Sequence, residues 1–366
     1  MSAPLSFRTM STKSTLFKFL PVLIANRRNL TKDVRIGFVG MVGRTPLIRL
    51  NKLSEDTGCD VMVKAEFASG GGSVKDRAAL YLVKEAVDNG TLRKGGTVVE
   101  GTAGNTGIGI AHICNAMGFK SVFFLPNNQS QEKIDALTTL GAEVHQVPVV
   151  PWDDENNYNH QARRFAEERD NTIWTDQFDN RANRQAHIET TGPEIWQQTG
   201  GEVDAVVFAT GTGGTLSGVS SYLKSVKPTV KAYVADPQGS VLYNYFTHGK
   251  LERTEGSSVA EGIGQGRLTN NLKGAPLDGA LHILDVDAVN MTFRLLEEEG
   301  FFVGVSSGVN VSAAEQVAKM LGPGHTIVTC LCDGGQRYYN RVFSRSWLES
   351  KGLLGALSKS HLRFLH

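Results

Sequence analysis

The stretch Gly71-Gly72-Ser73-Val74-Lys75-Asp76-Arg77 determines which fold and which chemistry this 366-residue chain predicts. A helix-forming run follows it, over residues 76–87. Glycines let a backbone approach a ligand closely, and Ser73 is a favourable N-cap. Lys75 is therefore expected in the first turn of a helix, where a free cation costs about 0.3–1 kcal/mol against the helix dipole. An amine held as an imine avoids that cost, while a solvated lysine after a turn is the alternative.

Two further glycine-rich loops occur on either side of the middle of the chain, GTAGNTG at 101–107 and GTGGT at 211–215. Each follows a buried strand and precedes an apolar helix, so backbone N–H groups and the helix dipole favour an anion there. A dinucleotide fingerprint is disfavoured in the second loop because Leu216 stands where the pattern requires a glycine. There is also no Walker lysine. We therefore predict that 211–215 binds one phosphate group.

Strands and helices alternate with the spacing of parallel β-strands joined by crossover helices. Strands are expected at 60–66, 97–100, 120–125, 143–149, 204–209 and 326–332. Helices are expected at 76–87, 108–117, 130–140, 160–169, 216–224, 312–321 and 344–350. This pattern and the length predict an α/β protein of two domains.

With these loops in place, the chain resembles the cysteine synthase family of fold-type II pyridoxal-phosphate enzymes. The lysine motif matches, and further similar segments occur before and after it in the family's order. These segments are residues 42–47, 101–107, 177–183, 189–195, 211–215, 262–264, 304–308 and 333–338. The resemblance covers about residues 40 to 350. It implies two three-layer domains with mostly parallel twisted sheets, as in tryptophan synthase β. Residues 40–180 would carry Lys75 and the substrate loop, with a movable part at about 120–170, and residues 181–350 would carry the phosphate loop.

The resemblance also implies a role for each matching residue. Lys75 would hold pyridoxal 5′-phosphate as an imine and then remove the substrate Cα proton, and Ser306 would hydrogen-bond the pyridine nitrogen. The other cofactor contacts would come from Asn105, Gly211, Thr212, Gly213, Gly214 and Thr215. Substrate contacts would come from Thr102, Ala103, Gly104, Asn105, Thr106, Gln177 and Gly262. Two departures from the family pattern are Ala103 in place of serine and Gln336 in place of glutamate.

A neutral Ser306 favours loss of a β-leaving group over transamination, because the ring nitrogen need not be protonated. By resemblance, O-acetyl-L-serine and sulfide would give L-cysteine and acetate. Cystathionine β-synthase and cyanoalanine synthase activities are alternatives, since small nucleophiles leave few contacts in a sequence. The 16 residues after Ser350 leave no room for the usual regulatory pair of the former. A non-catalytic scaffold that binds pyridoxal phosphate is the alternative of another class.

The net charge of +1 gives no indication of nucleic-acid binding. Residues 1–32 nevertheless hold six basic residues and no acidic one, so we predict a leader over residues 1–35 that directs import into mitochondria. A secretory signal, a short membrane anchor and a plain disordered tail on a cytoplasmic protein are the alternatives. The apolar run 19–25 contains Pro21 and is a poor membrane span. The resemblance implies a homodimer.

The basic tail from Lys359 to His366, which ends the segment 351–366, has no counterpart in the family, and we expect it to be disordered or weakly docked. The four cysteines show neither zinc-site spacing nor a disulfide framework, and no metal site is predicted. Cys330 and Cys332 are expected on one face of a strand. Two buried small hydrophobic residues are favoured there over a redox pair.

Overall fold

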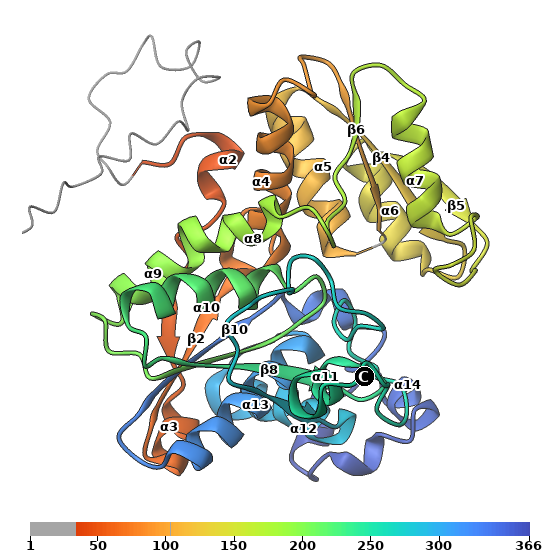
Figure 1. Cartoon of the computed structure of the whole chain (residues 1–366). Coiled ribbons are helices and arrows are strands. Elements are labelled where there is room, and N and C mark those ends of the chain that lie inside the picture. Colours follow the sequence, from red (N-terminus) through yellow and green to blue (C-terminus); the bar gives the residue numbers. More distant parts are fainter. Residues whose placement is uncertain (1–33, 103) are drawn as a thin grey trace, which may run out of the picture. The chain divides into compact units, whose positions relative to one another are not determined.

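The structure is a computed structural model that describes residues 34–102 and 104–366 (Figure 1). Ten strands of the described part form two sheets. The six-stranded sheet has the order β1 (Leu47–Arg49), β2 (Asp60–Ala65), β10 (Thr326–Leu331), β7 (Ala205–Ala209), β8 (Lys231–Pro237) and β9 (Gly279–Ile283). The four-stranded sheet has the order β5 (Glu143–Val147), β4 (Lys120–Pro126), β3 (Thr97–Gly101) and β6 (Thr172–Trp174).

All neighbouring strands are parallel except β1, which is antiparallel to β2. The predicted α/β class with mostly parallel sheets is therefore confirmed. Strands β1 and β2 come early in the chain but belong to the sheet of the later half, because β2 pairs with β10. The division into 40–180 and 181–350 stays a prediction, and the sheets do not follow it. By Cα packing, Gly37–His366 forms one compact unit.

The helices of the described part are α2 (Gly37–Met41), α3 (Asn51–Thr57), α4 (Lys75–Asp88), α5 (Asn105–Met117), α6 (Gln131–Thr139), α7 (Tyr158–Glu167), α8 (Ala182–Ala186), α9 (Gly192–Gln198), α10 (Gly214–Val226), α11 (Leu242–His248), α12 (Asp285–Glu299), α13 (Val305–Leu321) and α14 (Arg345–Ser350). Alternation along β7 explains how helices cover both faces of the large sheet. Val207 packs with α12 and α13, and Val206 packs with α10 on the opposite face.

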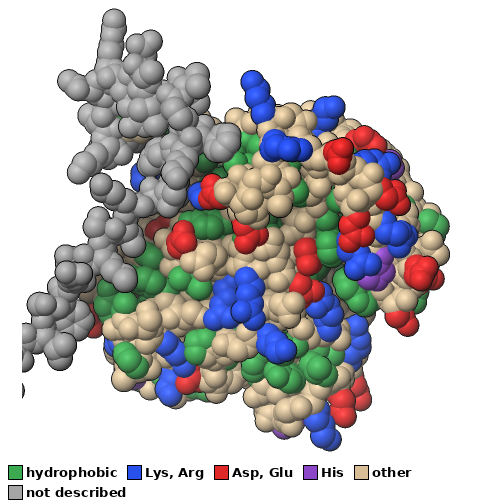
Figure 2. Space-filling model, turned by 45° about the horizontal axis from the view of Figure 1, so that its top comes forward, with side chains coloured by type: hydrophobic (Ala, Val, Ile, Leu, Met, Phe, Trp, Pro, Cys, Tyr) green, Lys and Arg blue, Asp and Glu red, His purple; other side chains and the backbone are tan. Residues whose placement is uncertain are grey.

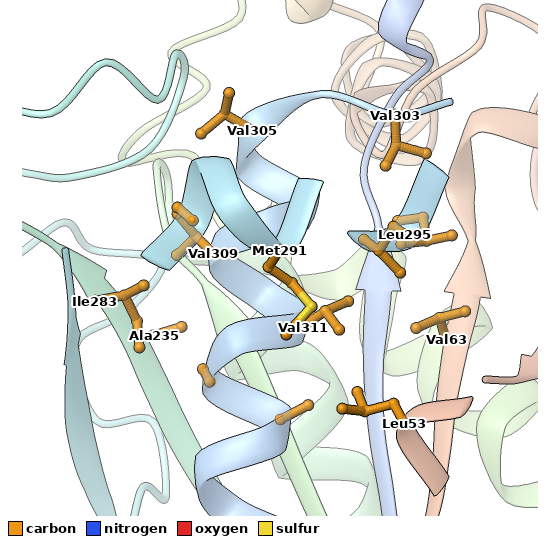
Figure 3. Packing of buried hydrophobic residues seen from close by; sticks show 14 of the residues in the cluster. Leu53, Val63, Ala235, Ile283, Met291, Leu295, Val303, Val305, Val309 and Val311 are labelled. Carbon is orange, nitrogen blue, oxygen red and sulfur yellow. The ribbon is translucent and has the colours of Figure 1, made fainter. Parts of the chain in front are cut away.

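Figure 3 shows part of the first of these clusters, in which Met291 of α12 lies beside Val311 of α13. A separate apolar cluster joins α4 and α5 to the small sheet, through residues such as Val83, Ile110 and Phe123. Each loop at the carboxyl end of a strand is therefore attached to a packed layer. This rigid attachment suits loops that must hold a ligand.

Two helix starts differ from the sequence expectation. Helix α4 begins at Lys75, and Val74 before it already has helical dihedrals, so the helical backbone starts earlier than the expected residue 76. The Ser73 hydroxyl accepts a hydrogen bond from the Lys75 amide at 3.3 Å, so the prediction that Ser73 caps this helix is confirmed. Helix α13 begins at Val305, seven residues before the expected start, with Gly304 as its extended cap.

The basic tail, residues 359–366, was expected to be disordered or weakly docked, and the prediction of disorder is wrong. His361 is buried, and its ring stacks on Phe293 with centroids 5.8 Å apart. The Nε2 atom of His361 lies 3.2 Å from a carboxylate oxygen of Glu297. The carbonyl of His366 accepts a hydrogen bond from the Arg345 amide at 3.1 Å. The tail thus completes the cover of α12.

The predicted leader, except for residues 34 and 35, lies outside the described residues. Within the described part, no helix combines the length and apolar character that a membrane crossing would require. Figure 2 shows one face of the molecule, on which basic and acidic side chains are interspersed.

Candidate active site

The lysine loop lies along the carboxyl end of β10. The Val74 amide donates to the carbonyl of Cys332 at 2.8 Å, and the next residue of that strand end, Asp333, bridges to Ser73. The loop is closed by Asp76, whose Oδ2 accepts from the Gly71 amide at 2.8 Å. A Cβ at position 71 would lie 2.5 Å from Asp76 Oδ1, so only glycine fits there.

Lys75 follows this closed loop at the first position of α4, and its side chain is partly buried. No other described residue hydrogen-bonds to its amine. Burial is the largest influence on two neighbouring groups, and it lowers the pKa of His187 and raises the pKa of Asp333. The positive charge of Lys75 is a smaller influence that lowers both pKa values. The amine therefore lies within electrostatic range of both the phosphate loop, which His187 contacts, and the end of β10.

A buried ionic network fixes the first turn of α4. Arg77 donates to Glu66 at 2.8 Å and to Glu194 at 2.7 Å, and Lys64 donates to Glu194 at 2.7 Å. Burial opposes the ionisation of Glu194, but the hydrogen bonds and charge of Arg77, with Lys64, lower its pKa to about 2. The carboxylate is therefore ionised at neutral pH, and it ties α9 to the helix that carries Lys75.

The predicted phosphate loop has the shape of an anion cradle. Gly213 has a φ of 84°, and the 13-residue helix α10 begins directly after it. A Cβ at Gly211 would lie 2.1 Å from the carbonyl oxygen of Gly262. The hydroxyl of Thr210 is buried and has no hydrogen-bond partner among the described residues. A glycine-rich loop, a helix N-terminus and an unpaired hydroxyl together fit a phosphate group.

Two side chains support this loop that the sequence reasoning did not assign. Asn183 Nδ2 donates to Thr212 Oγ1 at 2.9 Å, and His187 Nε2 lies 3.2 Å from Thr215 Oγ1. Burial, and then the neighbouring Arg77 and Lys75 charges, lower the pKa of His187 to about 3. A neutral imidazole therefore contacts the loop. Asn183 lies inside a segment that matched the family, and that match was the available signal.

Gly262, expected at the substrate, lies against the phosphate loop. The amide of Gly264 donates to the Thr210 carbonyl at 2.9 Å, and Gly262 itself is exposed. Its neighbour Glu261 lines a cleft of about 880 Å³ and pairs with Lys133 of α6 at 2.8 Å. The cleft is also lined by residues 130–132, 257–260, Asn340 and Arg341. The loop that packs on Gly211 is thus also one wall of this cleft.

The predicted substrate loop follows β3. Thr106 Oγ1 donates to Gln177 Oε1 at 2.6 Å, so the structure brings these two predicted residues together. The Gly104 amide donates to Thr102 Oγ1 at 3.2 Å, while Ala103 lies outside the described residues. The sequence reasoning missed Glu100. Its carboxylate is fully buried and accepts from the Gly101 and Gln177 amides, and burial raises its pKa to about 7.

Asn105 and Ser306 both lie beside the end of β10. Asn105 Nδ2 donates to Asp333 Oδ2 at 2.6 Å. Ser306 lies in the first turn of α13, and the hydroxyl of its neighbour Ser307 accepts a hydrogen bond from the Cys332 amide at 2.9 Å. The thiols of Cys330 and Cys332 are buried, with their sulfur atoms 3.7 Å apart on one face of the strand. The structure therefore places Lys75, Asn105 and Ser306 around residues 332 and 333, whereas Gln336 is exposed.

Residues 39–333 match the family model described as "Pyridoxal-phosphate dependent enzyme". Cysteine synthase 1 of Neurospora crassa is 60% identical over 331 residues, which are 89% of this chain and 88% of that protein. The putative mitochondrial cysteine synthase of Saccharomyces cerevisiae is 37% identical, over 88% of this chain and 87% of that protein. The crystal structure of O-acetylserine dependent cystathionine β-synthase from Helicobacter pylori has a TM-score of 0.76 and 29% identity, and covers 84% of this chain and 98% of that one.

Proposed function

Because the chain belongs to the family of pyridoxal-phosphate-dependent enzymes, we propose that it is a cysteine synthase, which converts O-acetyl-L-serine and sulfide to L-cysteine and acetate. One structural observation carries the proposal. Lys75, Asn105 and Ser306 surround the end of β10, and Ser306 offers the site a neutral hydroxyl. The 60% identity to a cysteine synthase over nearly the whole of both chains supports the choice of reaction.

The chain's own residues divide the work of binding the cofactor and the substrate. The loop 211–215 and the N-terminus of α10 would hold the phosphate, and Lys75 Nζ would be the covalent attachment point. Ser306 Oγ would hydrogen-bond the ring nitrogen without adding a charge. When bound, pyridoxal phosphate supplies an electron sink for the bonds of the substrate Cα. The loop that contains Thr102 and Thr106, with Gln177 beside it, would hold the substrate carboxylate.

Proton transfer is assigned to Lys75. Lys75 Nζ, once an amino-acid substrate has released it, would accept the proton from the substrate Cα and would later return it to the same carbon. Acetate would be the group lost from Cβ, and sulfide the group gained there. The hydrogen bond from the Gly71 amide to Asp76 closes the loop before Lys75 and so fixes the point from which its side chain extends.

The test is a substrate panel on purified protein. O-acetyl-L-serine, L-serine and O-phospho-L-serine are each supplied with sulfide, homocysteine or cyanide, and the products are identified by mass spectrometry. Cysteine and acetate from the first substrate with sulfide are expected. Cystathionine is the second candidate product, favoured by the structural likeness to an O-acetylserine dependent cystathionine β-synthase. A cofactor-bound protein that makes none of these products, and that behaves as Lys75→Ala does, would be a non-catalytic scaffold.

We further propose import into mitochondria. The support is the basic, acid-free composition of residues 1–32 and the likeness to a yeast protein named as a putative mitochondrial cysteine synthase. Expression of the full chain with a C-terminal fluorescent tag in fungal cells should give a mitochondrial signal, and deletion of residues 1–35 should abolish it. A uniform cytoplasmic signal from the full chain would contradict the proposal.

We also propose that the protein is a homodimer and that residues 120–170 move as a unit when substrate binds. Support for the movement is the small sheet, since β4 and β5 lie together at one edge of it and α6 contributes to the cleft wall. Light scattering should give twice the chain mass. Hydrogen exchange should slow in 120–170 on addition of substrate, and equal exchange rates with and without substrate would refute the movement.

A further inference from the structure

We propose that Asp333 and Arg337 are positioning residues that fix the side-chain amide of Asn105, so that one of its N–H groups is kept for the ring oxygen of the cofactor. The proposal rests on the proposed function, because it assumes that pyridoxal phosphate occupies the site. It goes beyond that function by assigning a role to two residues that act on the cofactor through Asn105. It also gives a reason for an acidic side chain in the interior of the site.

The orientation of the Asn105 amide follows from its two partners. Arg337 has only donors, and its Nη1 contacts Asn105 Oδ1. Asp333 Oδ2 accepts from Asn105 Nδ2 at 2.6 Å. A flipped amide would set donor against donor and acceptor against acceptor, so the pair selects one of two orientations. The Nδ2 atom carries two hydrogens, and no described residue uses the second one.

Asp333 is built into the interior rather than placed on the surface. Its exposed fraction is 0%, and its Oδ2 accepts a second hydrogen bond from the Tyr338 hydroxyl at 2.7 Å. The other oxygen, Oδ1, is buried without a partner among the described residues. An unsatisfied buried polar atom is unfavourable for stability. A neutral or apolar side chain would suit folding better, so the carboxyl group points to a role in the site.

The backbone around Asp333 connects the elements that carry the other cofactor residues. Asp333 bridges to Ser73, two residues before Lys75, and its carbonyl accepts from the Gly304 amide at 3.3 Å, two residues before Ser306. Arg337 Nη2 also donates to the Gly71 carbonyl at 2.6 Å. Asp333 and Arg337 therefore fix Asn105 relative to the lysine loop and to the start of α13. A shift of these two residues would move Asn105, Lys75 and Ser306 together.

The main variant is Asp333→Leu, which keeps the branched shape of the side chain and removes both acceptors. Asp333→Asn is the conservative variant, because its amide oxygen can occupy the Oδ2 place and accept both hydrogen bonds. The matched control is Asp236→Leu. Asp236 is also fully buried with an unpaired Oδ1, but its Oδ2 accepts from the Tyr243 amide at the start of α11. Each holoprotein is compared by its visible absorbance band across pH, its cofactor dissociation constant and its apoprotein melting temperature.

Asp333→Leu is expected to displace the visible band and to weaken cofactor binding by about tenfold, the cost of losing one charge-assisted hydrogen bond. Asp333→Asn is expected to keep the wild-type band. Asp236→Leu is expected to melt earlier and to keep the wild-type band as well. Adding Asp333→Leu to Asn105→Ala should change the band no further than Asn105→Ala alone, because the acid acts through the amide. If Asp333→Leu does not fold, Arg337→Met carries the same expectations.

A wild-type band in Asp333→Leu, or in Arg337→Met in its place, would overturn the inference. So would an equal displacement in Asp236→Leu, or a displacement by Asp333→Leu that is as large on the Asn105→Ala background as in wild type. These outcomes differ from a failure of the proposed function. That failure would appear as a wild-type protein that binds the cofactor normally and yields no product from the substrate panel.

Discussion

Gly211→Ala tests whether the loop 211–215 is the phosphate cradle. The added Cβ would lie 2.1 Å from the carbonyl oxygen of Gly262, and real Cβ contacts begin near 3.0 Å. One of the two segments must therefore move by almost 1 Å. A side chain cannot rotate to relieve the clash, because the neighbour is backbone held by the hydrogen bond from Gly264 to Thr210. Gly211 lacks a positive φ, so alanine is not strained by its own backbone.

Overpacking of this kind costs about 1–3 kcal/mol. If the strain falls on the cradle, the dissociation constant of pyridoxal phosphate rises by about 5- to 150-fold. The assay is titration of apoprotein with pyridoxal phosphate, followed by visible absorbance. Gly355→Ala is the matched control, because its Cβ meets nothing within 4 Å. Equal dissociation constants for wild type and Gly211→Ala, with unchanged melting temperatures, would refute the placement of the phosphate.

Three further predictions follow from buried contacts. Thr210→Val should raise the melting temperature of the apoprotein, because an unpaired buried hydroxyl is removed, and should weaken cofactor binding; tighter binding would contradict the assignment. The pKa of Glu194 is lowered to about 2. Its ionised carboxylate therefore adds about 3 kcal/mol to the free energy of unfolding above pH ~5, and this stabilisation is lost as the pH falls toward 2. The gap in unfolding free energy between wild type and Glu194→Gln should therefore shrink from pH 7 to pH 3, and a constant gap would argue against the ion network. His361→Ala should lower the urea-unfolding free energy by about 1 kcal/mol, whereas exposed Lys359→Ala should not; equal effects would count against a docked tail.

The fold and the positions of the three glycine-rich loops could be predicted because their signals are local. Each unit of strand, glycine loop and helix lies within one short segment, 60–88, 97–117 or 205–226, and the parallel sheets follow from their alternation. The pairing of β2 with β10 could not be foreseen in this way, since about 260 residues separate the two strands. Their registers depend on packing that covers both faces of the sheet.

The supporting residues of the site were missed for the same physical reason. Asp333 and Asn105 are 228 positions apart, and their contact exists only after both sheets have formed. Glu100 was predicted only as the last residue of a buried strand. Its carboxylate accepts from the Thr175 hydroxyl and the Gln177 amide, which lie 75 and 77 positions away in the chain. The order of the tail was misjudged because its basic charges can be read from the sequence, whereas its packing cannot. The apolar surface that it covers belongs to Phe293 of α12, which is distant in the chain.

The central claim is that the ε-amine of Lys75 holds the cofactor. The most direct measurement is reduction of the holoprotein with borohydride, digestion, and mass spectrometry of the peptides. The account predicts the mass of a reduced pyridoxyl phosphate on the peptide that contains Lys75, and no such adduct in Lys75→Ala. An adduct on another lysine, or a fully loaded wild-type protein that gives none, would contradict it.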